Sequence, residues 1–324
     1  MLVGILAAAA AVTAIVFVSP AALAQPYPAK PIRMIVGFPP GGGTDVVARV
    51  IGQKLGEWYG QTVVIENRAG ATGTIGADVL AKSPPDGYSL MMGHANSHAI
   101  APNLMSKLPY DPIKDFAPVA YVGYVPNVLS LHPSVPAKNM KELVALLKAN
   151  PGKFTYASSG NGSSQHLSGE MFKLLTGTNA LHVPYKGSGD AIKDLLAGTV
   201  SFNFDTMPPV LEHIKAGKLR GLGISTPRRL AQLPDVPTFA EEGLVGFEIL
   251  NWYGVMAPAA TPRDIVSKLA ADINKAMREP DVKARLEQVG TQLRELSPDE
   301  FGAFMRAELT KYAKLVKDAN IRLE

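Results

Sequence analysis

The sequence predicts an α/β fold made of two lobes that are joined by two crossover strands. Its 324 residues exceed the usual length of one domain, and 47% of them are hydrophobic, which is enough for a packed core. Short β-branched runs alternate with segments of helical periodicity along the chain. Two further segments have the composition of strands that pass from one lobe to the other.

The first third of the chain alternates strand and helix. Strands are expected at 32–36, 62–66 and 88–92, and helices at 47–58 and 74–82. A strand–helix–strand order predicts βαβ units and a largely parallel sheet.

The rest of the chain repeats this style without repeating the sequence. Strands are expected at 128–131, 154–157, 200–204 and 219–225, and helices at 140–150, 166–175, 191–197 and 208–216. Helices at 262–277, 280–289 and 298–319 are expected to end the chain.

Two segments are expected to pass between the lobes. Residues 121–127 contain glycine and proline between strand-like runs, and 250–257 form an aromatic-rich strand. A chain that leaves the first lobe near Tyr124 and returns near Asn251 divides into a first lobe of 25–124 and 251–324 and a second lobe of 125–250. Ligands of such folds bind between the lobes, at the carboxyl ends of the parallel strands.

The N-terminus has the pattern of a secretory signal peptide. Residues 2–18 are almost entirely apolar, and Ala22-Leu23-Ala24 matches a small-x-small cleavage site. We therefore expect residues 1–24 to be removed, so that the mature chain starts at Gln25 and is exported. One element of the signal-peptide pattern is missing, since no Lys or Arg precedes the apolar run. The alternative is an uncleaved membrane anchor, for which the run is barely long enough.

Composition excludes several functional classes. The net charge is only +4 and no run of five like charges occurs, so nucleic-acid binding is not expected. The absence of cysteine excludes thiol catalysis, cysteine zinc sites and disulfides. We expect a monomer without a cofactor.

Two glycine loops are candidate anion sites. Gly41-Gly42-Gly43-Thr44-Asp45 lies between a strand and a helix, where free backbone N–H groups bind anions. Val46 stands where the dinucleotide fingerprint needs its third glycine, and no P-loop occurs. The polar loop at 158–164 repeats the arrangement in the second lobe, and both loops would face the cleft. The alternative for each loop is a turn that caps its helix, through Thr44 or Asp45 in the first.

Catalytic and metal motifs are not recognisable. No Gly-x-Ser-x-Gly elbow and no His-Glu-x-x-His occurs. His94 and His98 have a spacing that suits a metal, but no Asp, Glu or Cys nearby completes a site. We expect neither a metal nor a catalytic residue. Asp205 is either a helix cap before Pro208 or a carboxylate at the cleft.

Seven segments together resemble one known family, the solute-binding receptors of tripartite tricarboxylate transporters, also called Bug or TctC-like proteins. Their order and spacing carry the resemblance, which covers essentially the whole mature chain. The segments are Phe38-Pro39-Pro40-Gly41-Gly42-Gly43-Thr44-Asp45, Glu66-Asn67-Arg68-Ala69-Gly70-Ala71, Leu108-Pro109-Tyr110-Asp111-Pro112, Tyr156-Ala157-Ser158-Ser159-Gly160-Asn161-Gly162-Ser163, Val183-Pro184-Tyr185-Lys186-Gly187-Ser188, Phe204-Asp205 and Leu233-Pro234-Asp235-Val236-Pro237-Thr238.

The resemblance implies a Venus-flytrap, type II-like periplasmic-binding-protein fold and a periplasmic location. It implies capture of a small organic carboxylate (a dicarboxylate, an acidic amino acid or an aromatic acid) for membrane permease subunits. It also implies that the two loops hold one carboxylate through Phe38, Pro40, Gly41, Gly42, Thr44, Asp45, Ser158, Ser159, Gly160, Asn161, Gly162 and Ser163. The far end of the ligand would meet His94, Asn96, His98, Lys186, Ser188, Asp205 or Trp252.

Two departures from the family pattern bear on the ligand. The family often has Thr or Gly near 94–97, where this chain has His94-Ala95-Asn96-Ser97, and often has proline where this chain has Asp190. Ligand identity is therefore not transferred from any relative. Two alternative functions stay open: a periplasmic ligand sensor for a signalling system, and a hydrolase or isomerase that acts on carboxylates.

Overall fold

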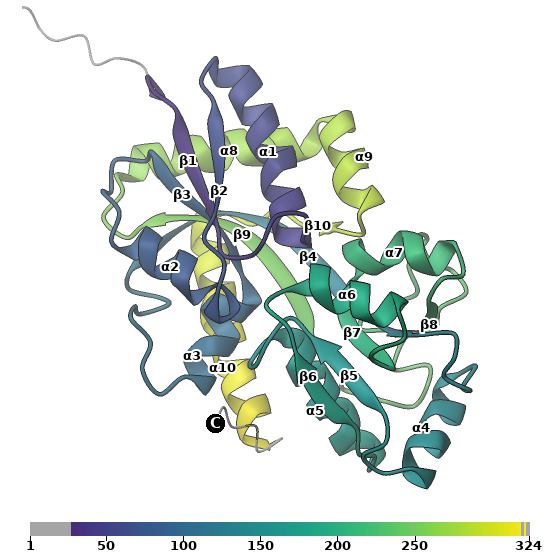
Figure 1. Ribbon diagram of the computed structural model, residues 1–324. Coiled ribbons are helices and arrows are strands. Elements are labelled where there is room, and N and C mark those ends of the chain that lie inside the picture. Colours follow the sequence, from purple (N-terminus) through teal and green to yellow (C-terminus); the bar gives the residue numbers. More distant parts are fainter. Residues whose placement is uncertain (1–26, 248, 319–320, 322–324) are drawn as a thin grey trace, which may run out of the picture.

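The computed structural model describes residues 27–247, 249–318 and 321, which form two α/β lobes (Figure 1). The expected signal peptide and the start at Gln25 lie outside these residues. Among the helices of the described part, none is both long and apolar enough to cross a membrane.

The first lobe contains a mixed sheet whose strands lie in the order β2-β1-β3-β9-β4. Strand β1 pairs in parallel with β2 and β3, as the βαβ pattern predicts, whereas β9 is antiparallel to both β3 and β4. The two residues of β10 pair antiparallel with β4 and complete the sheet of this lobe. The strands are β1 (Ile32–Val36), β2 (Val63–Asn67), β3 (Ser89–His94), β4 (Phe116–Leu131), β9 (Leu250–Pro258) and β10 (Gln292–Leu293).

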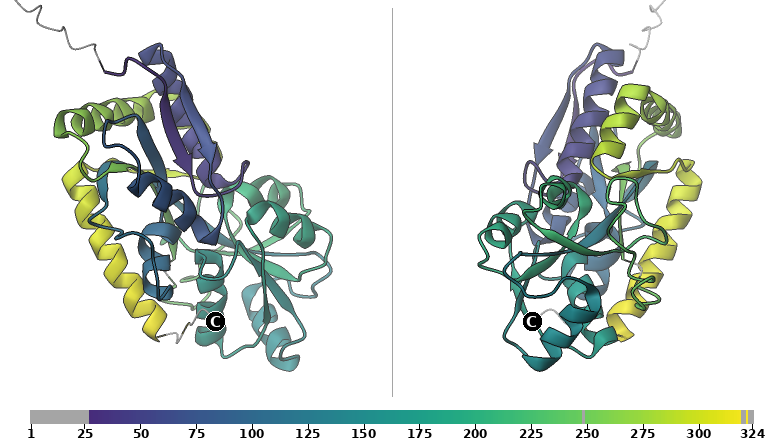
Figure 2. Two further views of the ribbon diagram at one scale, coloured as in Figure 1. Left: turned by 60° about the vertical axis from the view of Figure 1, so that its left-hand side comes forward. Right: turned by 90° about the vertical axis from the view of Figure 1, so that its right-hand side faces the viewer.

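Helices cover both faces of this sheet because side chains alternate along each strand. Ile32, Met34 and Val36 face α1 (Gly43–Tyr59), α8 (Arg263–Arg278) and α9 (Pro280–Gln288). Ile35 faces the other side, with α2 (Thr74–Ala81) and α10 (Pro298–Asp318). Figure 2 shows α10, in yellow, along the outside of the first lobe. The short helical turns η1 (Ala71–Gly73), η2 (Asn96–Ile100) and α3 (Ala101–Leu104) complete the lobe.

The second lobe extends the same sheet in the order β4-β7-β5-β6, with β8 also paired to β4. Helices α4 and α5 pack on the face that carries Phe202 and Phe204, and α6 and α7 pack on the opposite face. The elements are α4 (Met140–Ala149), β5 (Thr155–Ser158), α5 (Ser164–Thr176), β6 (Leu181–Pro184), α6 (Ser188–Leu196), β7 (Phe202–Thr206), α7 (Met207–Lys215) and β8 (Arg220–Ile224).

Strands β4 and β9 pass between the lobes, as the sequence predicts. They are antiparallel and pair from Phe116 opposite Pro258 to Pro126 opposite Leu250. The strand expected at 128–131 is only the end of a continuous 16-residue strand. Gly123 lies within this strand and has a φ of 141°. It packs against the Gln292 backbone, where a Cβ would overlap the carbonyl oxygen, so the position requires glycine.

Buried side chains join the two crossover strands to the second lobe. Asn251 Nδ2 donates to Asn127 Oδ1 at 2.6 Å, and Asn127 Nδ2 donates to Ser168 Oγ of α5 at 2.8 Å. Ser225 Oγ accepts from the Asn127 N–H and donates to the Ile249 carbonyl oxygen. Val125 lies opposite Asn251, so the predicted lobe boundaries at 124/125 and 250/251 lie side by side on the two crossover strands. We therefore propose these positions as the division between the lobes.

The packing of β9 on α10 makes a prediction about Gly254. A Cβ at this glycine would overlap the ring of Phe301, whereas a Cβ at Gly302 would meet its nearest neighbour, Pro118 Cγ, at 3.4 Å. We expect Gly254→Ala to lower the free energy of unfolding by about 3 kcal/mol through overpacking, measured by urea denaturation. Gly302→Ala is the matched control and should be neutral or slightly stabilising. Equal stability of Gly254→Ala and the wild type would contradict this packing.

Candidate functional site

A cavity of about 200 Å³ lies between the lobes. Residues after β1 and β3 and on β9 line it from the first lobe, and the beginnings of helices line it from the second. The lining residues are Phe38, Pro39, Pro40, Gly42, Gly43, Thr44, His94, Asn96, Ser159, Gln165, Gly187, Ser188, Gly189, Asp190, Lys193, Thr206 and Tyr253.

Four helices begin at this cavity. The first turns of α1, α5 and α6 contribute lining residues, as does Thr206, the N-cap residue of α7. The N-terminus of a helix carries the positive end of the helix dipole and, in α1, free backbone N–H groups as well, whereas the first turn of α7 contains Pro208 and Pro209, which have no N–H. By this physical argument the four helix starts favour an anion in the cavity.

The first glycine loop leaves backbone N–H groups free at the start of α1. The N-cap residue is Gly42, which has an extended backbone, and no side chain caps the helix. Among the described residues, no acceptor takes the N–H groups of Gly43 and Thr44. The helix-cap alternative for Thr44 and Asp45 is therefore wrong.

Asp45 shapes this loop from behind. Its carboxylate accepts from the Gly41 N–H at 3.0 Å, from Asn67 Nδ2 at 2.9 Å, and from Arg49 at 2.8 and 2.9 Å. Burial alone would raise the pKa of Asp45, but these hydrogen bonds hold it below its ordinary value. The bond to Gly41 fixes the turn that presents Gly43 and Thr44 to the cavity.

Gly43 also brings α1 close to β9. A Cβ at this position would lie 2.5 Å from the Tyr253 hydroxyl oxygen and 3.3 Å from Pro208 Cγ. Only a glycine allows this approach, which places the Tyr253 hydroxyl next to the free N–H groups.

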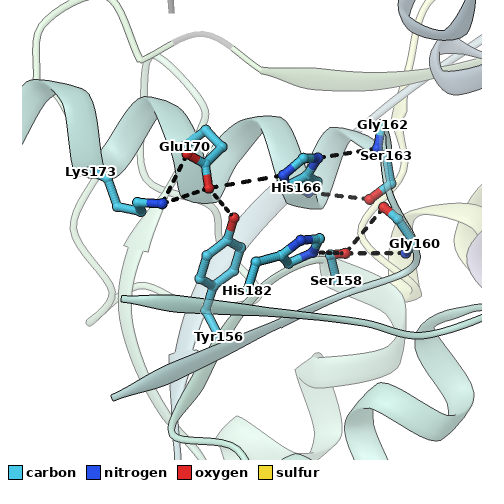
Figure 3. Close-up of polar contacts among 9 residues, drawn as sticks. All are labelled: Tyr156, Ser158, Gly160, Gly162, Ser163, His166, Glu170, Lys173 and His182. Atoms are coloured by element: carbon cyan, nitrogen blue, oxygen red, sulfur yellow. Dashed lines mark hydrogen bonds and ion pairs between the residues drawn. The ribbon is translucent and has the colours of Figure 1, made fainter. Parts of the chain in front are cut away.

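The second glycine loop is held from behind by two stacked histidines (Figure 3). The rings of His166 and His182 stack at 4.1 Å between centroids. His166 Nδ1 accepts from the Gly162 N–H at 3.1 Å, and His182 Nε2 lies 2.6 Å from Ser158 Oγ. Ser163 is the N-cap residue of α5, and its side chain accepts from the His166 N–H.

A charged group supports the two histidines. Glu170 accepts from the Tyr156 hydroxyl at 2.6 Å and from Lys173 at 2.8 and 2.9 Å, and it lies 3.9 Å from His166 Nε2 (Figure 3). Tyr156 stacks on His182. The polar atoms of this cluster are therefore used within the second lobe, and its role is to fix the loop.

His94 points a hydrogen-bond donor at the cavity. Its ring lies between Phe38 and Tyr253, with centroids 5.0 and 5.4 Å away. Burial, with a smaller contribution from the repulsion that a protonated His98 would exert, lowers the pKa of His94 to about 3, so the ring is neutral. Because Nδ1 accepts from the Asn96 N–H at 3.0 Å, the proton lies on Nε2, which has no acceptor among the described residues.

Two contacts connect the lobes beside the cavity. Asn96 Oδ1, in the first lobe, accepts from the Ser164 N–H at the start of α5 at 2.9 Å. Pro39 lies against Gly187, where a Cβ would come within 3.1 Å of its ring. The described structure is therefore one in which both lobes enclose the cavity.

Asp205 lies behind the second-lobe wall and accepts from three lining residues. Its Oδ1 accepts from Ser188 Oγ at 2.7 Å, from the Thr206 N–H at 2.7 Å and from Gln165 Nε2 at 3.2 Å. Burial raises the pKa of Asp205 to about 6, and these hydrogen bonds oppose the rise. Thr206, and not Asp205, is the N-cap residue of α7.

Most of the predicted site residues fall into three groups. Eight of them line the cavity, namely Phe38, Pro40, Gly42, Thr44, His94, Asn96, Ser159 and Ser188. Others lie directly behind the lining, namely Gly41, Asp45, Ser158, Gly162, Ser163 and Asp205. Three line a neighbouring groove of about 730 Å³ beside Ala71 and Thr72, namely Gly160, Asn161 and Lys186.

His98 and Trp252 are away from the cavity. The His98 ring packs against Tyr110, Phe116 and Trp252 in the core of the first lobe. Tyr253, which the sequence analysis did not select, lines the cavity instead. Successive side chains of a strand point to opposite faces, so on β9 only one of these two aromatic residues reaches the cavity.

Other lining residues that the sequence analysis missed occupy helix starts. Gln165, Gly189 and Thr206 belong to the first turns or caps of α5, α6 and α7, and Lys193 lies one turn further along α6. The available signal was their position directly after β-strands, at the edge where ligands of α/β sheets bind. Asp190, noted as a departure from the family pattern, also lines the cavity and accepts from Lys193 at 2.9 Å.

The site contains no evident catalytic arrangement in the described residues. Ser158 and His182 form a hydroxyl–imidazole pair, but Ser158 is buried and lies outside the cavity lining. Among the described residues, no three His, Asp or Glu side chains are grouped to hold a metal ion.

The buried histidines predict acid sensitivity. Burial lowers the pKa of His94 and His98 to about 3 and of His182 to about 4, so the unfolded chain binds protons below pH 6.5 that the folded chain does not. Stability should fall as pH drops from 6.5 towards 4, by about 1.4 kcal/mol per pH unit for each such proton. Asp205 and Glu308 oppose this trend, because burial raises the pKa of each carboxyl. Thermal melting at pH 7.5, 6.5 and 5.5 measures the effect, and a melting temperature that rises on acidification would contradict it.

Comparison with known proteins places the chain in a family. The model described as "Tripartite tricarboxylate transporter family receptor" matches residues 47–321. Protein BugT of Bordetella pertussis is 41% identical over 315 residues, which cover 95% of this chain and 97% of BugT. The resemblance found in the sequence is confirmed.

Solved structures of periplasmic receptors share the fold of this chain. The periplasmic binding protein BugD superposes with a TM-score of 0.88 at 35% identity, over 92% of this chain and 100% of BugD. Rpa4515 of R. palustris, solved with adipate, has a TM-score of 0.89 at 35% identity, over 91% and 99% of the two chains. MatC of Rhodopseudomonas palustris, solved with malate, has a TM-score of 0.83 at 32% identity, over 90% and 100%. This chain therefore belongs to the tripartite tricarboxylate transporter receptor family, as a Bug-type periplasmic receptor with the two-lobed periplasmic-binding-protein fold.

Proposed function

We propose that this receptor captures a small organic carboxylate in the cavity between its lobes and delivers it to the membrane subunits of a tripartite tricarboxylate transporter. The observation that carries the proposal is the meeting of four helix N-termini around the cavity, with the N–H groups of Gly43 and Thr44 free. Relatives solved with adipate and malate support the choice of a carboxylate as the anion.

The size of the cavity supports a small acid. Its volume of about 200 Å³ lies below the range of roughly 300–1,000 Å³ that is typical of pockets for drug-sized ligands. One carboxylate oxygen would accept from the free N–H groups of α1, and His94 Nε2–H would donate to the same group. Hydrogen bonds from neutral donors to a charged group contribute about 1.5–3 kcal/mol each.

Capture and release would follow the hinge formed by β4 and β9. Parting of the lobes breaks the bond between Asn96 and the Ser164 N–H and opens the cavity. The ligand stabilises the closed form because only that form offers hydrogen-bonding partners from both lobes. The proposal includes a monomeric receptor, exported by cleavage after Ala24.

The ligand is proposed to leave unchanged. His94 is the imidazole of the cavity lining, and its Nδ1 is occupied while its Nε2 carries the proton, so it is a poor general base. Incubation of the receptor with a bound acid, followed by NMR of the acid, should show no conversion.

A thermal-shift screen of carboxylates on the receptor tests the proposal. A bound acid at a hundred times its Kd should stabilise the protein by about 2.7 kcal/mol and raise its melting temperature. Adipate and malate are the first probes, with neutral and cationic solutes as controls. The proposal fails if only the neutral or cationic solutes raise the melting temperature.

Gly43→Ala tests the location of the site. Its Cβ would displace the Tyr253 hydroxyl, so we expect at least tenfold weaker binding by calorimetry of any acid found in the screen. Gly42→Ala is the matched control, since its Cβ would meet its nearest neighbour, Pro39 O, at 3.6 Å. Adding Tyr253→Phe to Gly43→Ala removes the clashing oxygen and should recover part of the affinity. Wild-type affinity in Gly43→Ala would show that the acid binds elsewhere.

A further inference from the structure

Three hydroxyl groups on the second-lobe wall of the cavity direct their hydrogens away from it. Ser188 Oγ donates to Asp205 Oδ1 at 2.7 Å, and Thr206 Oγ donates to the same oxygen at 3.3 Å. Ser159 Oγ donates to Gln165 Oε1 at 2.8 Å. A hydroxyl has one hydrogen and two lone pairs, so a hydroxyl that donates to a buried acceptor presents only lone pairs elsewhere.

Asp205 sets all three orientations. An ionised carboxylate only accepts, so the Gln165 amide must turn its Nε2 towards Asp205, at 3.2 Å, and its Oε1 towards Ser159. The carboxylate thus orients Ser188 and Thr206 directly and Ser159 through Gln165. Burial raises the pKa of Asp205 only to about 6, so the group is ionised at pH 8.

The two walls of the cavity therefore differ in hydrogen-bonding character. The first lobe presents donors: the free N–H groups of Gly43 and Thr44 and the Nε2–H of His94. The side-chain hydroxyls of the second lobe present acceptors. A ligand with only a carboxylate would accept from these donors, but it would offer no hydrogen to the lone pairs of the three hydroxyl oxygens.

The charged side chains of the lining do not offer a site for a second carboxylate. They are Asp190 and Lys193, and they pair with each other at 2.9 Å. On the second-lobe wall, the side chains of the lining residues therefore present lone pairs and no unpaired cation, next to the backbone N–H groups at the start of α6.

We propose that the ligand is a carboxylate that also carries a hydrogen-bond donor, a hydroxyl or an ammonium group, and that Asp205 determines this specificity by orienting Ser159, Ser188 and Thr206. The inference rests on the proposed function, since it assumes that the carboxylate occupies this cavity. Asp205 acts as a positioning residue, through the hydroxyls that meet the donor.

Matched pairs of acids test the inference by calorimetry at pH 8. The probes are succinate against malate, butanoate against 3-hydroxybutanoate, and benzoate against 3-hydroxybenzoate, with aspartate as the ammonium counterpart of malate. We expect the hydroxylated member of each pair that binds to bind at least tenfold more tightly, because its loss leaves buried acceptors unpaired. Equal or tighter binding of the unsubstituted acid overturns the inference and leaves the proposed function standing. Binding of no acid at all overturns both.

Asp205→Ala tests the role of the carboxylate. The substitution removes the oxygen that accepts from Ser188, Thr206 and Gln165, so the hydroxyl hydrogens become free to turn towards the cavity. We expect the ratio of affinities within a pair to fall towards one, while the unsubstituted acid keeps its affinity. An unchanged ratio overturns the role of Asp205.

Two further variants keep this test decisive. Ser188→Ala removes one of the three hydroxyls while the Asp205 carboxylate stays in place, and it should lower the ratio several-fold, even if Asp205→Ala does not fold. Asp272→Ala is the matched control on α8, where the carboxylate accepts from Tyr59 outside the cavity, and it should leave the ratio unchanged. An unchanged ratio in Ser188→Ala would contradict the inference.

Discussion

The antiparallel pairing of β4 with β9 is the constraint on which the rest of the structure depends. Both strands pass between the lobes, and their pairing runs from Phe116 opposite Pro258 to Pro126 opposite Leu250. The buried bond from Asn251 to Asn127 and its continuation to Ser168 tie this pair to α5. The helix starts of the two lobes therefore face each other across one cavity, and the proposed hinge motion would change their separation.

The cavity balances positive helix ends against one buried carboxylate. Four helix N-termini favour an anion, and Asp205 beneath the second-lobe wall compensates part of that potential while it holds Ser188, Gln165 and Thr206. The first lobe uses a similar device, since Asp45 holds Gly41 and leaves Gly43 and Thr44 free. In both lobes a buried acid shapes the wall and stays outside the lining.

Much of the architecture and half of the site followed from local pattern. Strand–helix alternation predicted the βαβ units, and the composition of 121–127 and 250–257 predicted the crossovers. The glycine loops predicted lining residues such as Thr44 and Ser159. Residues such as Tyr253, Gln165 and Lys193 were missed because the direction of a side chain depends on strand register and on the exact residue at which a helix begins.

The sequence by itself determined the fold class and the family and predicted an anion as the ligand, because periodicity, glycine loops and ordered motifs are properties of neighbouring residues. Only the tertiary structure decided which face of β9 reaches the cavity and that four helix N-termini converge there. It also decided that the pair His94–His98 divides, with His94 at the cavity and His98 in the core. These outcomes depend on contacts between residues far apart in the chain, such as Asn96 with Ser164 and Gln165 with Asp205, which no local pattern encodes.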